Sequence, residues 1–161
     1  MIDPSAVVLG DLTLGDDVSI WPNCSIRADM HHIDIGDRSN IQDNSVLHVT
    51  HASAFNPTGW PLRIGCDVTV GHRAVLHGCA LKDRIIVGMG AIVMDGAVID
   101  DDIIIAAGAL VAPGKHLASG WVYAGSPAKP MRELNDSERQ FLSYSAKNYV
   151  QLKNRYLGIN P

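Results

Sequence analysis

The amino-acid sequence predicts an all-β solenoid of six-residue repeats followed by a C-terminal α-helix. Three observations lead to this prediction. An apolar residue recurs every six positions through most of residues 6–130, glycine and aspartate cluster between these positions, and residues 136–157 change to helical spacing. A fixed period indicates stacked units that bury their apolar faces against one another. The 161 residues fit a single domain with a sizeable core.

The repeats become visible when the chain is cut into sixes, such as AVVLGD and LTLGDD near the start and IIVGMG and AIVMDG later. Alternate side chains of an extended segment point to opposite sides, so places one and three of each unit face inward and places two and four face outward. Gly and Asp at places four to six suit corners between short strands. The third place is held by Val8, Leu14, Ile20, Ile26, Ile41, Leu47, Ile64, Val70, Leu76, Val87, Val93, Ile99, Ile105, Val111 and Leu117.

This repeat resembles the left-handed parallel β-helix of the hexapeptide-repeat superfamily, and the resemblance covers residues 6 to about 130. It implies triangular coils of three repeats, or about 18 residues. We therefore expect a left-handed β-helix domain over residues 1–130, with a loop insertion at 49–61. Residues 131–161 are expected to form a connector and a C-terminal helix packed on the same domain.

The C-terminal helix is predicted over residues 136–157, where apolar residues recur at steps of three and four. Asn135 and Glu138 have the spacing of a capping box, and Gly158 is a natural stop. Prolines in the preceding segment GSPAKPMREL, residues 125–134, favour a connector that is neither helix nor strand.

Two histidines occupy equivalent places in the repeat. His48 and His77 each follow an inward third-place residue, so both take the outward fourth place. Leu47 and Ile64 are 17 positions apart instead of six, which leaves an 11-residue insertion. Subtracting 11 from the 29 positions between His48 and His77 leaves 18, one coil by the resemblance. The two side chains should therefore stack about 4.8 Å apart, where they can share a metal ion.

His72 lies at a corner five residues before His77, and five extended residues span about 16 Å. Zinc ligation requires about 2.0–2.1 Å from each imidazole nitrogen to the metal. One chain should therefore not close a three-histidine site, whereas a neighbouring chain in a closed ring can supply its His72. An outward apolar stripe at place two predicts an interface on the same face. It consists of Val46, Val75, Ile92 and Leu110.

Counting coils also places two charges beside the histidines. Arg27 lies one coil below His48, and Asp43 lies one coil below His72. If the two columns face each other across subunits, Arg27 and Asp43 form an interface ion pair with Gln42 nearby.

The segments IRAD, NIQDNSVLH and VGHRAVLHG together resemble the γ-class carbonic anhydrases, in their bacterial branch. The resemblance implies a homotrimer whose interfacial metal sites each take His48 and His77 from one subunit and His72 from the next. It also implies an intersubunit ion pair between Arg27 and Asp43. Three further positions match residues that the family places in or near the pocket: Asp29, Gln42 and Tyr149.

Three neutral imidazoles suit zinc and leave open positions for water, whose pKa the metal can lower to about 7. Metal-bound hydroxide would attack CO₂, so the predicted function is reversible hydration of this small-molecule substrate to bicarbonate. Imidazoles also suit iron or cobalt. CO₂ hydration releases a proton that must leave the site. Because the chain has no glutamate before Glu133, other residues are the candidates for carrying it. They are Asp29, His31, His32, His51 and Tyr149.

Other functions of this fold stay open at the level of sequence. One is an inactive homologue that serves as a metal-binding scaffold. A second is a CoA thioesterase that uses the same metal centre on an acyl carbonyl. A third is a hexapeptide acyltransferase, which needs one functional histidine and no three-histidine metal site.

Composition excludes some partners. A net charge of −4 and a pI near 5.9 argue against a nucleic-acid surface, which needs clustered Lys and Arg. No apolar run approaches the roughly 18 residues of a membrane span, and Asp3 lies where a secretion signal carries positive charge. We therefore expect a cytoplasmic protein. Three cysteines without metal-type spacing are expected to be reduced packing thiols: Cys24, Cys66 and Cys79.

Overall fold

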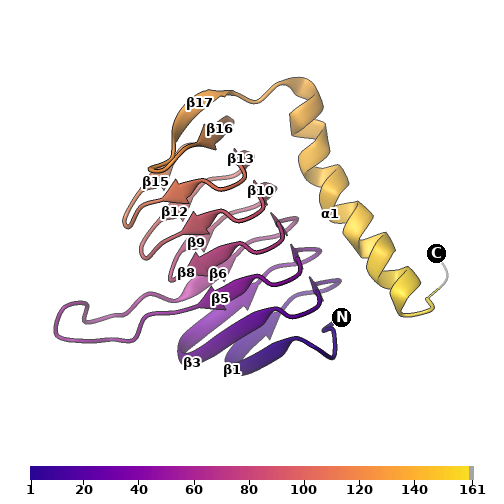
Figure 1. Cartoon of the computed structure of the whole chain (residues 1–161), viewed down its shortest axis with the longest axis horizontal. Helices are drawn as coiled ribbons and strands as arrows, with labels where there is room; N and C mark the ends of the chain where they lie inside the picture. Colours follow the sequence, from indigo (N-terminus) through magenta and orange to yellow (C-terminus); the bar gives the residue numbers. More distant parts are fainter. Residues whose placement is uncertain (160–161) are drawn as a thin grey trace.

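In the computed structural model, which describes residues 1–159, the chain forms a β-helix of stacked parallel coils with one α-helix beside it (Figure 1). Short strands repeat along the stack, and corners separate them. The predicted fold class, a left-handed parallel β-helix with a C-terminal helix, is confirmed.

The strands form three faces, of which faces one and two belong to a single hydrogen-bonded sheet. Strand β3 (Ser25–Ile35) starts on face one and ends on face two, and β1 (Val7–Leu14) pairs with it. Face one continues through β5 (Val46–His48), β8 (Val75–His77), β11 (Ile92–Val93) and β14 (Leu110–Val111). Face two continues through β6 (Leu62–Ile64), β9 (Ala80–Leu81), β12 (Val98–Ile99) and β15 (His116–Leu117). Face three consists of β2 (Ser19–Ile20), β4 (Asn40–Ile41), β7 (Thr69–Val70), β10 (Ile85–Val87), β13 (Ile103–Ile105) and β16 (Trp121–Ala124).

The register between coils follows the predicted spacing. Ile85 pairs with Ile103 at the interval expected for one coil, and His48 pairs with His77 at the interval expected for one coil plus the loop at 49–61. One coil is shorter by a single position, because Val75 pairs with Ile92 and not with Val93. The insertion therefore lengthens one coil without disturbing the alignment of the strands on either side of it.

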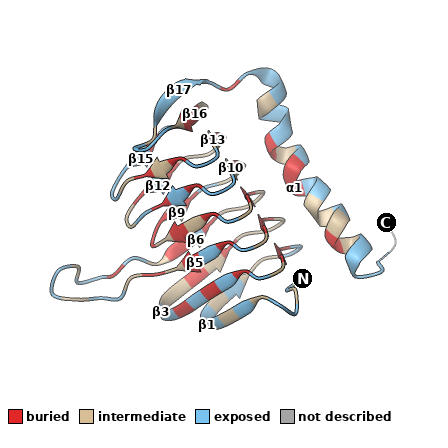
Figure 2. Cartoon of the chain, viewed as in Figure 1, coloured by how far each residue is buried: buried red, intermediate tan, exposed pale blue. Residues whose placement is uncertain are grey.

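Third-place side chains fill the interior of the β-helix. Along face one the register stacks five of them, each at most 1% exposed. Figure 2 shows the resulting alternation of buried and exposed residues along the strands. Burying one aliphatic side chain of this size stabilises a fold by about 1.5–3 kcal/mol, so this column is a main source of cohesion. Its members are Ile26, Leu47, Leu76, Val93 and Val111.

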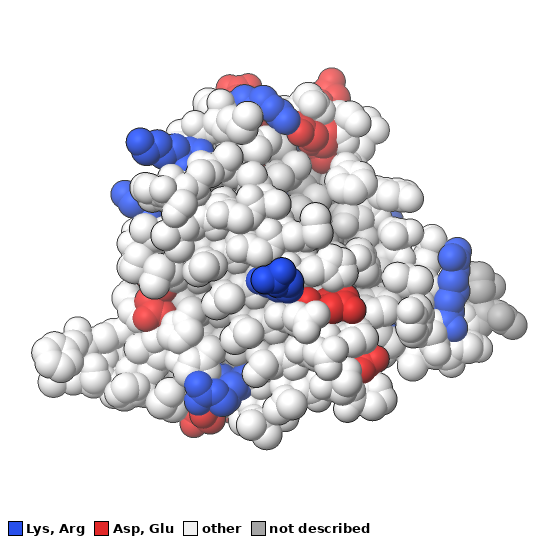
Figure 3. All heavy atoms as spheres, in the orientation of Figure 1, with Lys and Arg blue, Asp and Glu red and all other residues white. Residues whose placement is uncertain are grey.

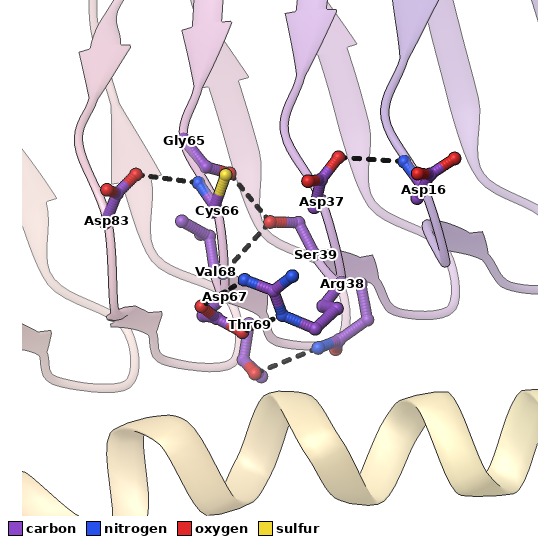
Figure 4. Close-up of polar contacts among 11 residues, drawn as sticks. Asp16, Asp37, Arg38, Ser39, Gly65, Cys66, Asp67, Val68, Thr69 and Asp83 are labelled. Carbon is purple, nitrogen blue, oxygen red and sulfur yellow. Dashed lines mark hydrogen bonds and ion pairs between the residues drawn. The ribbon is translucent and has the colours of Figure 1, made fainter.

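At the corner between faces two and three, aspartates join one coil to the next (Figure 4). The carboxylate of Asp37 accepts from the backbone N–H of Asp16 at 2.8 Å, and that of Asp83 accepts from the N–H of Cys66 at 2.8 Å. Asp101 accepts from the N–H of Asp83 in the same way. Aspartates at the positions that the repeat assigns to corners therefore bind successive coils together.

A column of alternating charge runs along the same corner, through residues whose φ angles lie between 55° and 60°. Arg38 donates two hydrogen bonds to Asp67, at 2.7 and 2.8 Å, and Arg84 donates two to Asp102, at 2.6 and 3.0 Å. The left-handed backbone is unfavourable for these residues. Exposed ion pairs contribute about 0–1 kcal/mol each and offset part of that cost.

Helix α1 (Asp136–Tyr156) starts at the predicted capping box. Asn135 accepts from the backbone N–H of Glu138 at 2.9 Å, and Glu138 accepts from the N–H of Asn135 at 3.0 Å. Hydrogen bonds from Arg132 are the main reason that the pKa of Glu138 falls to about 2. Gly158 takes a left-handed φ of 68° just after the helix, where the sequence predicts the stop.

Helix α1 packs on face three, and a chain of buried polar groups joins the two. Gln42 Nε2 donates to Asn40 Oδ1 at 3.2 Å, and Asn40 Nδ2 donates to Thr69 Oγ1 at 2.9 Å. The hydroxyls of Thr69 and Ser145 then share a hydrogen bond of 2.9 Å between strand and helix. Nearer the end of the helix, buried Lys153 donates to Asp17 at 2.8 Å.

The prediction of a connector without strand over residues 125–134 is wrong. Residues Lys129–Glu133 form β17, which runs antiparallel to β16. Pro130 fits there because β17 is the last strand of its sheet, where one side of the backbone has no partner strand.

The insertion at 49–61 projects from the coils between β5 and β6 (Figure 1). Two backbone hydrogen bonds between Thr50 and Trp60, of 3.0 and 2.8 Å, close its root. Among residues 1–159, no helix has the length and apolar character to cross a membrane.

Two glycines of one corner provide a test of coil spacing. A Cβ on Gly88 would lie 2.4 Å from the backbone nitrogen of Ala107, whereas a Cβ on Gly90 would meet nothing within 4 Å. We expect Gly88→Ala to lower the free energy of unfolding by about 3 kcal/mol through overpacking. Gly90→Ala, with φ of 68°, should cost about 1 kcal/mol. Urea unfolding followed by circular dichroism at one chain concentration measures both, and equal losses would contradict the spacing argument.

Candidate metal centre

His48 and His77 end adjacent strands of face one and lie directly side by side. Their Cα atoms are register partners, and their ring centroids are 5.0 Å apart. Nδ1 of His48 and Nε2 of His77 face each other at 3.0 Å. The predicted stacking of these two side chains is therefore confirmed.

This separation fits a shared metal ion. With bonds of about 2.0–2.1 Å, two nitrogen ligands of tetrahedral zinc lie about 3.4 Å apart, so a small adjustment of either ring accommodates the ion. Imidazole nitrogens are suitable ligands for zinc, iron or cobalt. The two side chains are only 12% and 36% exposed, so the pair is partly shielded from solvent.

His72 lies apart from this pair, at the corner between β7 and β8. Its Nδ1 is 3.0 Å from Asp43 Oδ2. Within residues 1–159, no three or more His, Cys, Asp or Glu side chains gather as a metal-binding group. One chain therefore brings together two of the three predicted ligands.

Each of the three histidines has a carboxylate on one ring nitrogen. Asp29 Oδ1 lies 3.2 Å from His48 Nε2, and Asp95 Oδ1 lies 2.6 Å from His77 Nδ1. The contact of His72 with Asp43 completes the set. Histidines that bind metals usually donate their second N–H to a carboxylate or carbonyl, which orients the ring. The arrangement is thus typical of metal-ligating histidines.

Arg27 also contacts Asp29, at 2.5 Å from Nη1 to Oδ2. This hydrogen bond is the main reason that the pKa of Asp29 is lowered, and the contact with His48 lowers it further. Within one chain Arg27 thus pairs with Asp29, while Asp43 pairs with His72. The Arg27–Asp43 pair expected between subunits stays a prediction.

Gln42 and Tyr149 lie on the same side as His72. Together with it they line a cavity of about 330 Å³ between face three and α1, whose other walls include Met89 and Phe141. Gln42 is 6% exposed, and the ring of Tyr149 packs edge-on against Trp21. Burial, and secondly the charge of Asp43, raise the pKa of Tyr149. Its hydroxyl therefore keeps its proton at neutral pH and can donate a hydrogen bond.

The predicted site residues thus fall into two groups at opposite ends of the strands of face one. His48, His77, Asp29 and Arg27 lie at one end, and His72, Asp43, Gln42 and Tyr149 lie at the other. Sequence reasoning missed Asp95 and its partner Thr50, whose hydroxyl donates to Asp95 Oδ2 at 2.8 Å. The available signal was the spacing, because Asp95 follows His77 by 18 positions, the coil length that the family resemblance implies.

The apolar stripe predicted at place two lies between these two ends. Its four residues are consecutive register partners, and two of them are each 39% exposed. On the side of the molecule seen in Figure 3, acidic and basic side chains are scattered, and most of the surface carries neither. The stripe consists of Val46, Val75, Ile92 and Leu110.

Comparison with known proteins places the chain among curated relatives of similar sequence. It is 60% identical to Protein YrdA of Escherichia coli over 98% of this chain and 85% of that protein. It is 45% identical to a probable carbonic anhydrase of Methanocaldococcus jannaschii, over 94% of this chain and 91% of that protein. Gamma carbonic anhydrase 2 of Arabidopsis thaliana mitochondria is also 45% identical over 94% of this chain, which spans 54% of that longer protein.

Solved structures give the same fold. A hexapeptide transferase family protein from Anaplasma phagocytophilum matches with a TM-score of 0.84 and 38% identity, over 96% of this chain and 91% of that one. A putative acetyltransferase from Bacillus cereus matches with a TM-score of 0.86 and 37% identity, over 99% and 92%. No family model matches the sequence. By its relatives and its fold, the chain belongs to the γ-class carbonic anhydrase homologues among the hexapeptide-repeat proteins.

Proposed function

We propose that the chain is a subunit of a homotrimeric, zinc-dependent γ-class carbonic anhydrase that hydrates CO₂ reversibly to bicarbonate. The observation that carries the proposal is the facing pair of His48 and His77, with ring nitrogens 3.0 Å apart and a carboxylate on the far nitrogen of each ring. The relatives named as carbonic anhydrases support the same activity.

The third ligand in this proposal is His72 of a neighbouring copy. The two ends of face one carry complementary groups, since Arg27 accompanies the histidine pair and Asp43 accompanies His72. Repeating this contact around a ring of three copies gives every His48–His77 pair a His72 and also forms the predicted Arg27–Asp43 pairs. The exposed apolar stripe of face one would then be covered.

The residues of the chain prepare the site for the hydration of CO₂. Zinc bound to three neutral imidazoles would supply acidified water at neutral pH. Asp29 and Asp95 hold the outer nitrogens of His48 and His77, so that the facing nitrogens stay available as ligands. Gln42 and Tyr149 are placed beside His72 to donate hydrogen bonds to a substrate oxygen. Apolar walls nearby suit uncharged CO₂.

The balanced reaction converts CO₂ and H₂O into bicarbonate and one proton, which must leave. Asp29 is a weak base because the hydrogen bond from Arg27 lowers its pKa. His31 and His32 near the loop offer another route, because their Nδ1 atoms lie 3.1 Å apart and an imidazole has one nitrogen that can accept a proton and one that can donate it. We therefore assign proton export to His31 and His32.

Acyl transfer or thioester hydrolysis is the second candidate function. It is favoured by the solved structures named as a hexapeptide transferase family protein and a putative acetyltransferase, at 37–38% identity over nearly the whole chain. A thioesterase would use the same metal centre on an acyl-CoA carbonyl. An acyltransferase would need a histidine base and no metal ion.

The first prediction concerns metal binding. Protein purified without oxygen should hold one zinc, iron or cobalt ion per chain, and chelation should lower the melting temperature, because the ion binds only the folded state. His48→Ala and His77→Ala should each abolish binding. His116→Ala is the matched control, because His116 also contacts an aspartate, Asp100 at 2.8 Å, on another face. Elemental analysis after dialysis measures the metal content of each variant. Loss of metal from His116→Ala would contradict the assignment of His48 and His77 as ligands.

The second prediction tests the sharing of sites between subunits. His72→Ala chains alone and His77→Ala chains alone should both be metal-free. After the two are refolded together in equal amounts, about one quarter of the sites should pair an intact His48–His77 set with an intact His72. Two affinity tags isolate the mixed trimers from the two homotrimers, and each mixed trimer should hold metal in about one third of its sites, as its metal content measures. Mixed trimers without metal would contradict a shared site.

The third prediction concerns the reaction. Stopped-flow measurement of CO₂ hydration should show turnover that rises with pH through an ionisation near neutrality. The same preparation should be assayed for acetyl-CoA hydrolysis. Full metal content with hydrolysis and no hydration would favour the thioesterase, whereas full metal content with neither activity would indicate a scaffold.

A further inference from the structure

We infer that Asp95 is a positioning residue for His77 and that Thr50 holds Asp95 in place, so that the loop at 49–61 is coupled to the metal centre. The inference rests on the proposed function in one respect, since it takes His77 as a metal ligand. Asp95 acts through His77 and is not assigned contact with substrate.

Asp95 uses both carboxylate oxygens. Oδ1 lies 2.6 Å from His77 Nδ1, and Oδ2 accepts from the Thr50 hydroxyl at 2.8 Å. Asp95 lies one coil above His77, whereas Thr50 comes from the loop that follows His48. A carboxylate bonded at both oxygens is fixed in rotation, so it defines the plane and position of the imidazole.

The contact also selects the tautomer of His77. A carboxylate only accepts hydrogen bonds, so the proton of the neutral imidazole lies on Nδ1. Nε2 then carries the lone pair, and it lies 3.0 Å from His48 Nδ1, where the two nitrogens can share a proton or a metal ion. Asp95 therefore presents the nitrogen that a metal ion requires, and protonation of Nε2 would block ligation.

The root of the loop is built around this contact. Thr50 and Trp60 are joined by two backbone hydrogen bonds. A Cβ on Gly78, the residue after His77, would lie 2.7 Å from Trp60 Cβ and 2.5 Å from Asp95 Oδ1. The indole of Trp60 also lies over Gly96, where a Cβ would meet it at 3.0 Å. The loop thus packs on the neighbours of both His77 and Asp95, and the Thr50 hydroxyl is its polar link to the centre.

Another histidine–aspartate contact in the chain shows what a merely structural pair looks like. His116 Nε2 lies 2.8 Å from Asp100 Oδ2, but the His116 side chain is 63% exposed, and Lys82 binds the other oxygen of Asp100 at 2.7 Å. The ring of His116 has no second histidine beside it among residues 1–159. Asp100→Ala is therefore a matched control for Asp95→Ala.

The experiment uses the full chain and two readouts. The first is the tautomer of His77 in metal-free protein, from long-range ¹H–¹⁵N NMR correlations at one fixed pH, with His77→Ala for assignment. Wild type should show the Nδ1–H form. Asp95→Ala should populate the Nε2–H form, and Asp95→Asn, which keeps an acceptor, should shift less. Thr50→Val should shift partly, and Thr50→Ser should restore the wild-type pattern.

The second readout is zinc affinity, from competition with a chelator. Asp95→Ala should bind zinc about 10–100-fold more weakly than wild type. The zinc affinities of Asp95→Asn and Thr50→Val should lie between those of Asp95→Ala and wild type. Thr50→Ser and Asp100→Ala should bind zinc as tightly as wild type. Circular dichroism checks that each variant is folded, and the nearly isosteric Thr50→Val keeps the test decisive if Asp95→Ala does not fold.

The outcomes separate this inference from the proposed function. An unchanged His77 tautomer and zinc affinity in folded Asp95→Ala would overturn the inference even if wild type binds zinc. Equal effects of Asp95→Ala and Asp100→Ala would overturn it as well. If the wild-type protein binds no metal ion while Asp95 still sets the tautomer, the proposed function fails and the positioning of His77 by Asp95 stands.

Discussion

The register between coils is the constraint on which the structure depends. Third-place side chains such as Leu47 and Leu76 stack in the interior with no exposed surface, and any slip by one residue would turn them outward. Backbone hydrogen bonds then fix the height of each coil. Corner groups reinforce the same alignment, because Asp37 and Asp83 bind the backbone of the neighbouring coil. This alignment therefore sets the position of every outward side chain.

The proposed metal centre is a direct result of this alignment. His48 and His77 are distant in the sequence, yet they are register partners because the loop at 49–61 leaves the coil and returns without changing its phase. The strand backbone therefore delivers two imidazoles at ligand separation without a dedicated binding loop. His72 is held at the opposite end of the same face by the same geometry. The same geometry explains why one chain cannot complete the proposed centre and why the apolar stripe is exposed.

Contacts with carboxylates orient the three histidine rings. Asp29, Asp95 and Asp43 each place a carboxylate on one ring nitrogen of His48, His77 and His72 respectively, and the other ring nitrogens of His48 and His77 face each other. The insertion contributes through Thr50, whose hydroxyl donates to Asp95 and so makes the loop part of the support of His77. Helix α1 supplies Tyr149 to the other end of the face, and the buried hydroxyl contact of Thr69 and Ser145 fixes the helix there.

The sequence by itself determined the repeat, the inward column, the loop at 49–61, the capping box at Asn135 and the stacking of His48 on His77. All but the last follow from periodicity and short-range spacing, which a linear pattern contains, whereas the stacking also needs the 18-residue coil that the family resemblance implies. Only the tertiary structure decided that Lys129–Glu133 becomes a strand, that Arg27 pairs with Asp29 in the chain, and that Thr50 and Asp95 support His77. Each of these depends on which sheet edge is free, which way a side chain rotates, or where an aperiodic loop returns. Such choices are made by packing between segments distant in sequence, and a six-residue period carries no information about them.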